Sequence, residues 1–168
     1  MKLDTLNDVF VDQLADLYSA ETQLVKALPS VANAASDSDL SQAVTEHLDE
    51  TRGHVQRLEQ AFQELGVTPP TETCEAMQGL IAEAEEIISA TGDPVAKDVA
   101  LIAAAQRVEH YEIAAYGTAR TLAKQLDHDA VAGLLSDTLD EESDADKKLT
   151  KIATGGFAAS GVNDQALR

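Results

Sequence analysis

The chain has 168 residues, a formal net charge of −18 and only 4% aromatic residues. This length suits a single domain with a substantial core, and the scarcity of aromatic residues favours helices over sheets. Nucleic acids and anionic membrane surfaces would repel so negative a chain, which argues against binding to either. The single cysteine, Cys74, excludes an internal disulfide framework and a thiolate metal site, and we expect it to be a small buried core residue.

The acidity leaves two interpretations open. The protein is adapted to a high-salt cytosol, where its self-repulsion is screened, or it is an ordinary acidic bacterial protein. The chain shows no signal-peptide pattern and no run of about 18 apolar residues. We therefore expect a soluble, cytoplasmic protein.

Apolar residues at helical spacing predict a first helix from about Thr5 to Ala35, with a kink or local irregularity at Pro29. A turn of serine and aspartate residues then supplies several N-cap candidates for a second helix. This helix runs to about Leu65, where a glycine and two prolines end it. A shorter helix within residues 71–92 is expected to cross between the two halves of a bundle.

An Asp-Pro pair at residues 93–94 is typical of a helix start and predicts a third long helix, which runs to about Leu126. A fourth helix is predicted over Asp129 to Thr154, where two glycines end it. This order of elements predicts an all-α four-helix bundle with one long connection that carries a short extra helix. We assign residues 1–156 to the bundle and residues 157–168 to a mobile C-terminal tail.

Each predicted long helix carries a glutamate deep within it: Glu21, Glu50, Glu112 and Glu142. A buried carboxylate is costly unless it is paired, hydrogen-bonded or bound to metal. Four carboxylates that converge in one bundle would repel one another, and a pair of cations would remove that cost. The sequence therefore predicts a dinuclear metal centre inside the bundle.

Two of these helices add a second candidate ligand one turn further on. His54 follows Glu50 by four residues, and Asp146 follows Glu142 by four residues. Residues four apart share a helix face, so each pair is predicted to point at the metals.

Further side chains near the glutamates are candidates for supporting roles. His47 could replace the later histidine as a ligand, and Glu109 could be an extra ligand or a base beside the site. Tyr18, Tyr111 and Tyr116 lie one turn or less from the carboxylates and could hydrogen-bond the ligands. Oxygen and nitrogen donors without thiolates suit iron or manganese best, so we predict two Fe or Mn ions.

Five stretches of the chain carry a family resemblance: residues 16–24, 47–51, 79–84, 100–118 and 138–142. Through them the chain resembles the YciE/YciF group of ferritin-like proteins. The resemblance implies a ferritin-like bundle with a dinuclear carboxylate site, an association with stress responses, and homodimers.

The chain departs from the usual ferritin-like pattern, which places Glu-x-x-His on two helices. Counted back from His54 the glutamate position is Thr51, and counted back from Asp146 it is Ser143. Thr51 and Ser143 point about 100° away from the preceding glutamates, so we predict that neither is a ligand.

Two functions follow as hypotheses. The first is a redox-active di-metal protein, of a peroxidase or oxidase type, that reacts with a small oxidant such as peroxide or dioxygen in a stress response. The alternative is a non-catalytic helical interaction module in which the metal is structural or absent.

Overall fold

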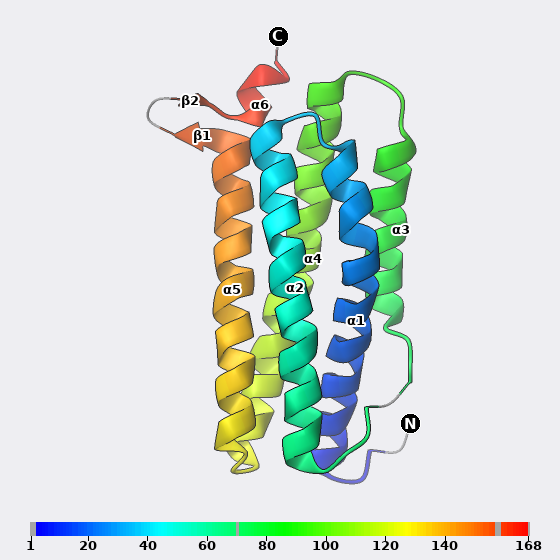
Figure 1. The fold of residues 1–168 in the computed structure, drawn as a ribbon, viewed down its shortest axis with the longest axis vertical. Coiled ribbons are helices and arrows are strands. Elements are labelled where there is room, and N and C mark those ends of the chain that lie inside the picture. Colours follow the sequence, from blue (N-terminus) through cyan, green and yellow to red (C-terminus); the bar gives the residue numbers. More distant parts are fainter. Residues whose placement is uncertain (1–2, 70, 157–158, 168) are drawn as a thin grey trace.

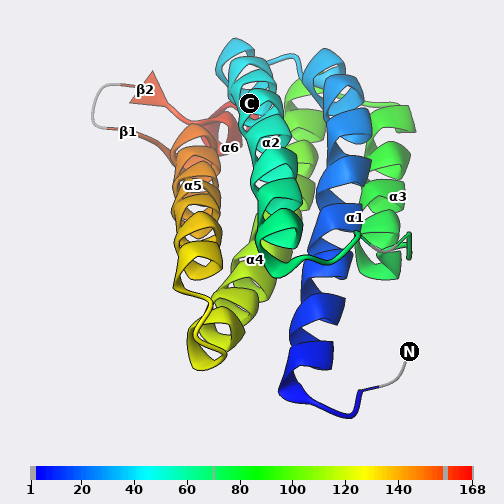
Figure 2. The same ribbon diagram turned by 60° about the horizontal axis from the view of Figure 1, so that its bottom comes forward.

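The computed structural model describes residues 3–69, 71–156 and 159–167. Within them, four long helices form an all-α bundle in which neighbouring helices run antiparallel (Figure 1). A fifth helix lies outside the bundle, along α1 and α4, within the long connection (Figure 2). The bundle helices and this crossover helix are α1 (Leu6–Ala34), α2 (Ser38–Leu65), α3 (Glu75–Ser89), α4 (Pro94–Gln125) and α5 (Asp129–Thr154). The predicted bundle with a short crossover helix is confirmed.

Local sequence explains where the helices begin and end. Thr5 forms a capping box at the start of α1, and Asp37 and Asp93 accept backbone N–H bonds at the starts of α2 and α4. Gly66 ends α2 with a left-handed φ of 66°, a conformation that glycine adopts without strain. Helix α1 continues through Pro29, where an irregularity was predicted.

The apolar interior consists of two clusters, one toward each end of the bundle. We call the first the aromatic core; it contains Phe10, Leu14, Leu17, Leu58, Phe62, Tyr116, Val131 and Leu135. We call the second the aliphatic core; it contains Leu24, Leu28, Leu40, Val44, Leu101, Ile102, Met77 and Leu149.

Helix α3 is attached more loosely than the bundle helices. Its one fully buried side chain is Met77, and Leu80, Ile81 and Ile88 are only partly buried against the aliphatic core. Cys74 caps the start of α3 and is 1% exposed, as expected for a core residue.

The described residues of the predicted tail, 159–167, contain short regular elements. Strand β1 (Gly155–Gly156) pairs antiparallel with β2 (Ala159–Ser160), and α6 (Val162–Gln165) follows. Val162 is 2% exposed, and a Cβ on Gly161 would clash with the Ala153 carbonyl oxygen. The described part of this segment therefore packs on the bundle, and glycine permits that close approach. Residues 157–158 and 168 of the predicted tail lie outside the described residues.

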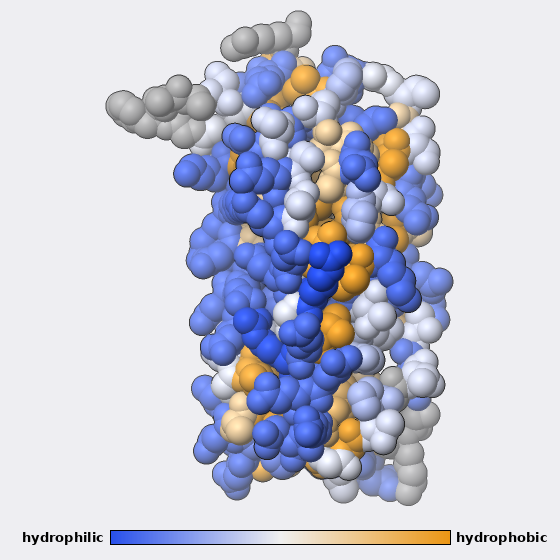
Figure 3. Space-filling model, in the orientation of Figure 1, coloured by the Kyte–Doolittle hydropathy of each residue, from blue (hydrophilic) through white to orange (hydrophobic). Residues whose placement is uncertain are grey.

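The surface is largely hydrophilic over α2 and α5, whereas most of the exposed apolar atoms lie on the side of α1 and α3, with smaller apolar areas near the lower end (Figure 3). Among the helices that the structure describes, none is long and apolar enough to cross a membrane.

Candidate metal centre

A layer of ionisable side chains separates the two apolar cores. All four bundle helices contribute to it, and every member is at most 7% exposed. We call these residues the buried cluster: Glu21 from α1, His47 and His54 from α2, Glu109 and Glu112 from α4, and Glu142 from α5.

The cluster residues lie on the helix faces that pack inside the bundle, as α2 illustrates. On α2, the buried positions include His47, Thr51 and His54, which follow Val44 at spacings of three and four residues. This is the spacing of a helix face that packs in a bundle. The polar residues thus stand at the centre of the buried face of α2, in line with its apolar residues.

One half of the cluster is arranged around His54. Its Nδ1 atom lies 3.3 Å from Glu21 Oε1 and 3.0 Å from Glu142 Oε1. The Tyr116 hydroxyl donates a hydrogen bond of 2.5 Å to Glu21 Oε1. Ligand atoms of Glu21, His54 and Glu142 all lie within 4.8 Å of one another, close enough to share one ion.

The other half is arranged around His47. Its Nε2 atom lies 3.6 Å from Glu109 Oε1 and 3.7 Å from Glu142 Oε2. Glu112 joins this group, and ligand atoms from the four residues again lie within 4.8 Å of one another. Glu142 belongs to both groups, with one oxygen near each histidine.

Each histidine is held from outside the cluster by a carboxylate on its other nitrogen. Nε2 of His54 lies 2.9 Å from Glu141, which Arg57 holds through two bonds of 2.6 and 2.7 Å. Nδ1 of His47 lies 3.3 Å from Glu50. Such outer carboxylates fix the ring orientation of metal-binding histidines.

Among the described residues, eight buried side-chain oxygen and nitrogen atoms have no hydrogen-bond partner, and all eight belong to the buried cluster. Four of them, on His47, His54 and Glu142, lie 3.0–3.7 Å from a group of opposite charge, and the other four lie on Glu21, Glu109 and Glu112. Buried polar groups are almost always hydrogen-bonded, so this concentration of atoms without a hydrogen bond favours a bound ligand. Asp98 provides the contrast. This buried carboxylate accepts bonds of 2.9 Å from the Ser36 N–H and 2.8 Å from the Asp37 N–H, and it fastens the α1–α2 turn to α4. The fold therefore pairs a buried carboxylate fully where its role is structural.

The cluster shifts the pKa values of its own members. Burial alone would lower the pKa of His47, but the charge of Glu109 and the contact with Glu50 raise it to about 9. Burial also opposes protonation of His54, yet its contacts with Glu142 and Glu21 raise its pKa to about 11.

The carboxyl groups do not all shift in one direction. Burial, followed by the charges of other glutamates, raises the pKa of Glu112 well above its usual value, and burial likewise raises that of Glu109. Burial would raise the pKa of Glu142 as well, but the contact with His54 and the charge of His47 lower it. Without metal, protons on the imidazoles and on some carboxyl groups compensate the charge.

The structure brings together most of the predicted ligands. Glu21, His54, Glu112 and Glu142 lie in the cluster, and so do His47 and Glu109, which were predicted as secondary candidates. Both histidines face the cluster, so both are candidate ligands, and His47 does not have to replace His54.

Glu50 and Asp146 lie outside the buried cluster. The Glu50 side chain is 48% exposed and contacts the outer nitrogen of His47. Asp146 pairs instead with His110, at 3.3 Å, and with Gln106. The interior position one residue after Glu50 is occupied by Thr51, which is 0% exposed and donates to the His47 carbonyl oxygen. The structure thus reverses the predicted facing of Glu50 and Thr51.

Of the three tyrosines that were predicted to hydrogen-bond the ligands, only one does so. Tyr116 reaches the cluster, whereas Tyr18 bonds Glu59 at 3.2 Å on the surface. Tyr111 bonds Asp16 and lies 3.0 Å from Cys74 Sγ. Neither Tyr18 nor Tyr111 contacts a cluster residue through its hydroxyl.

Glu141 and Arg57 are the functional candidates that the sequence did not reveal. Arg57 follows His54 by three residues, which places it one turn away on the same side of α2. This spacing from a candidate ligand is the sequence pattern that could have identified Arg57. Nothing distinguishes Glu141 from the acidic residues around it until α5 is packed against α2.

Comparison with known proteins identifies the relatives of this chain. Residues 5–165 match the family model described as "Domain of unknown function (DUF892)". The chain is 49% identical over 154 residues to Protein YciF of Escherichia coli K12, covering 91% of this chain and 93% of that protein.

Solved structures agree with this relationship. The crystal structure of the E. coli stress protein YciF superposes with a TM-score of 0.87 at 49% identity, covering 89% of this chain and 94% of that one. YcfI, a putative structural protein from Rhodopseudomonas palustris, also gives 0.87, at 42% identity, with coverage of 91% and 99%. A dodecameric thioferritin from Bacteroides fragilis gives 0.67 at 19% identity, with coverage of 86% and 83%, and shares the fold alone. The chain therefore belongs to the DUF892 family and has the YciF-like, ferritin-like fold that its sequence indicated.

Proposed function

We propose that the buried cluster holds two divalent transition-metal ions, iron or manganese. The observation that carries this proposal is the set of eight buried atoms without a hydrogen bond, all on residues that converge from four helices. In this proposal Glu21 and His54 bind one ion, while His47, Glu109 and Glu112 bind the other. Glu142 would serve both ions.

Charge supports two ions rather than one. The cluster contains four glutamates and two histidines. Two divalent cations would neutralise four ionised carboxylates in a layer that lies between two apolar cores, where an unbalanced charge is costly. Carboxylate oxygens and imidazole nitrogens without thiolates suit iron or manganese.

We further propose that the centre reacts with peroxide or dioxygen as part of a stress response. When bound, a pair of iron or manganese ions would supply electrons for reduction of the oxidant. The chain's own residues would hold the centre in place. Tyr116 fixes one oxygen of Glu21, and Glu141 together with Arg57 fixes the ring of His54. The similarity to a protein described as a stress protein supports this context.

Metal reconstitution tests the binding proposal. Protein stripped by chelator and then given Fe(II) or Mn(II) should take up about two ions per chain, measured by elemental analysis after desalting. Glu112→Ala should lower that number sharply, whereas Glu85→Ala, on the exposed side of α3, should leave it unchanged. No uptake of either metal by the wild type would overturn the proposal.

Rapid mixing of the Fe(II)-loaded protein with hydrogen peroxide tests the redox proposal separately. Oxidation of the bound iron, followed by optical absorption, should be faster than that of free Fe(II) in the same buffer. If metal binds but peroxide and dioxygen leave it unchanged, the metal is structural and the interaction-module alternative is the better account. Homodimer formation stays a prediction, to be measured by sedimentation equilibrium.

A further inference from the structure

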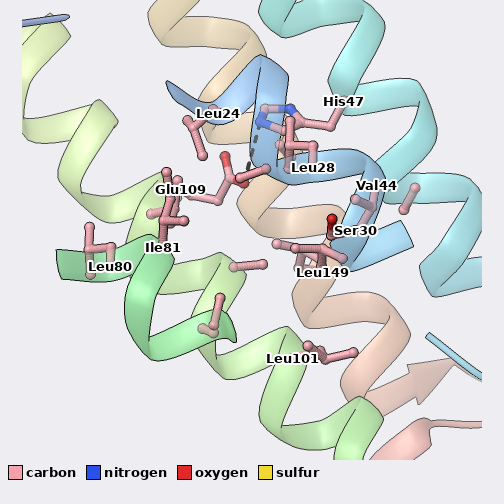
Figure 4. A pocket seen from close by; sticks show the side chains of 18 of the residues that line it. Leu24, Leu28, Ser30, Val44, His47, Leu80, Ile81, Leu101, Glu109 and Leu149 are labelled. Atoms are coloured by element: carbon pink, nitrogen blue, oxygen red, sulfur yellow. Dashed lines mark ion pairs between the residues drawn. The ribbon is translucent and has the colours of Figure 1, made fainter. Parts of the chain in front are cut away.

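A cavity of about 270 Å³ lies in the aliphatic half of the molecule, among α1 to α5 (Figure 4). Its wall is mostly aliphatic and includes Leu24, Leu28, Leu80, Ile81, Leu101 and Leu149. A wall of this kind offers little to a polar molecule, because burial of a polar group without a hydrogen bond is unfavourable.

One end of the cavity is polar. His47 and Glu109 line the cavity and are also members of the buried cluster. Figure 4 shows both side chains at one end of the group of apolar side chains, with Leu101 toward the other end. The cavity and the cluster therefore share two residues, and a molecule in the cavity would touch the cluster at one end.

The outer wall of the cavity is the part of the fold that can yield most easily. Leu80, Ile81 and Ile88 of α3 line the cavity and are only partly buried, and α3 is fixed by one fully buried side chain, Met77. Segments with few buried apolar contacts open at the lowest free-energy cost. Movement of α3 would admit a ligand without disturbing the four bundle helices.

The rim of the cavity carries charges of both signs, and most of them are compensated. Its exposed or half-buried charged residues are four acids and two lysines: Glu50, Glu85, Glu141, Asp144, Lys26 and Lys148. Glu50 contacts His47, Glu141 pairs with Arg57, Asp144 pairs with Lys147, and Lys148 pairs with Glu46. The rim therefore offers an anionic headgroup no concentration of uncompensated cations, and the chain as a whole carries −18.

The volume sets the size of the ligand. An apolar cavity of about 150 Å³ accepts benzene, and sites for drug-sized ligands measure roughly 300–1,000 Å³. Scaling from the benzene case, a cavity of about 270 Å³ accepts a molecule of roughly ten non-hydrogen atoms.

We propose that this cavity binds an uncharged organic molecule that is mostly hydrocarbon, of about ten carbon atoms, with one end against His47 and Glu109. The proposal that the cavity binds such a molecule rests only on the residues that line it. The further step, that the molecule is presented to bound metal as a substrate, rests on the proposed function.

Calorimetric titration of the metal-free protein with 1-decanol and with decanoate tests the binding site. Decanol should bind with one molecule per chain, and decanoate should bind at least tenfold more weakly because a charged carboxylate is costly to bury in an apolar cavity of a strongly negative chain. Equal or tighter binding of decanoate, or no binding of decanol, would overturn the proposal.

A matched pair of variants on α3 locates the site. Ala84 lines the cavity, whereas Ala82, two residues away on the same helix, is exposed and does not line it. Ala84→Phe should fill the space and weaken decanol binding at least tenfold, and Ala82→Phe should leave it unchanged. Circular dichroism checks that each variant folds. If Ala84→Phe does not fold, Ala105→Leu on the α4 wall replaces it, with the same expected loss. Unchanged binding in a folded filling variant contradicts the assignment.

Two further measurements separate this proposal from the metal proposal. Hydrogen exchange should slow in α3 on decanol binding, with or without metal; unchanged α3 exchange would contradict the location. In protein loaded with Mn(II), the NMR signals of bound decanol should broaden through proximity to the paramagnetic ion. If decanol binds but the protein takes up no metal, the proposed function fails and the binding site stands. If metal binds and the decanol signals stay sharp, the cavity does not present its ligand to the centre.

Discussion

The two apolar cores of the bundle differ in how they are filled. Three large aromatic side chains, Phe10, Phe62 and Tyr116, are 0% exposed in the aromatic core. The aliphatic core is built mainly from leucine, valine and alanine, and it borders the cavity of about 270 Å³. One scaffold thus has an end with large buried aromatic side chains and an end that borders a cavity, with the buried cluster between them. The comparison suggests that the aromatic core supplies stability and the aliphatic core supplies access to the cluster.

The largest expected effect comes from a pair of matched substitutions, one in each core. Leu14 in the aromatic core and Leu101 at the cavity are 0% and 1% exposed. Leu→Ala substitutions in cores cost about 2.7–5.0 kcal/mol, and the cost rises with the volume of the new cavity and with the dispersion attraction that its lining atoms forfeit. We expect Leu14→Ala to cost about 4–5 kcal/mol and Leu101→Ala about 3 kcal/mol, measured by urea denaturation of metal-free protein.

Equal losses, or a larger loss for Leu101→Ala, would show that the aliphatic core is packed at least as well as the aromatic core. The comparison between the two cores would then fail, whatever the cluster binds.

Metal should stabilise the layer between the two cores. A ligand that binds only the folded state adds about 2.7 kcal/mol to the free energy of unfolding at a free concentration of 100 times its Kd. Addition of Mn(II) to the stripped protein should raise the thermal midpoint accordingly, and a chelator should reverse the rise. A midpoint that does not move with Mn(II) or Fe(II) would mean that the folded state binds neither.

The stability of the metal-free protein should depend on pH because protons compensate the cluster's charge. The pKa of His47 is about 9, above its ordinary 6.5, so its stabilising contribution is full below pH 6.5 and is lost as the pH rises through 9. The raised pKa values of Glu109 and Glu112 act in the same direction. We expect the free energy of unfolding to fall by on the order of 1–3 kcal/mol between pH 6.5 and 9.5.

Metal affinity should change in the opposite sense, because the ligands must lose their protons to bind. Denaturation curves at the two pH values, with and without Mn(II), measure both trends. A metal-free protein that gains stability as the pH rises would contradict the assigned protonation of the cluster.

The smallest expected effect concerns the surface. With a net charge of −18, self-repulsion should weaken as salt shortens the Debye length from about 30 Å at 0.01 M to about 3 Å at 1 M. Thermal midpoints should therefore climb with salt, and both Leu→Ala variants should climb in parallel, because the charge lies outside both cores. A flat dependence would argue against adaptation to high salt.

The helices were predictable because their ends are encoded locally. The Asp93 cap followed by a proline, and Gly66 after α2, place boundaries within a residue or two of those observed. The folding of residues 159–167 onto the bundle was not predictable. It depends on the close approach of Gly161 to the end of α5, a contact that no local pattern announces.

The site was predicted in part, and the errors have one physical source. The facing of Glu50 was inferred from its spacing of four residues to His54. The buried face in fact centres on His47, Thr51 and His54. A shift of one residue, about 100° around the helix, moved Glu50 outside and Thr51 inside. When polar residues occupy the centre of a buried helix face, the hydrophobic pattern of the sequence does not show which way that face points.

The central claim is that two ions share the buried cluster through Glu142. The most direct test is the number of Mn(II) ions bound per chain by Glu142→Gln, measured by elemental analysis beside wild type and Glu50→Gln. The variant keeps the size of the side chain and removes its charge, while Glu50 lies outside the cluster. We predict about two ions for wild type and for Glu50→Gln, and at most one for Glu142→Gln. Two ions in Glu142→Gln, or none in the wild type, would contradict the account.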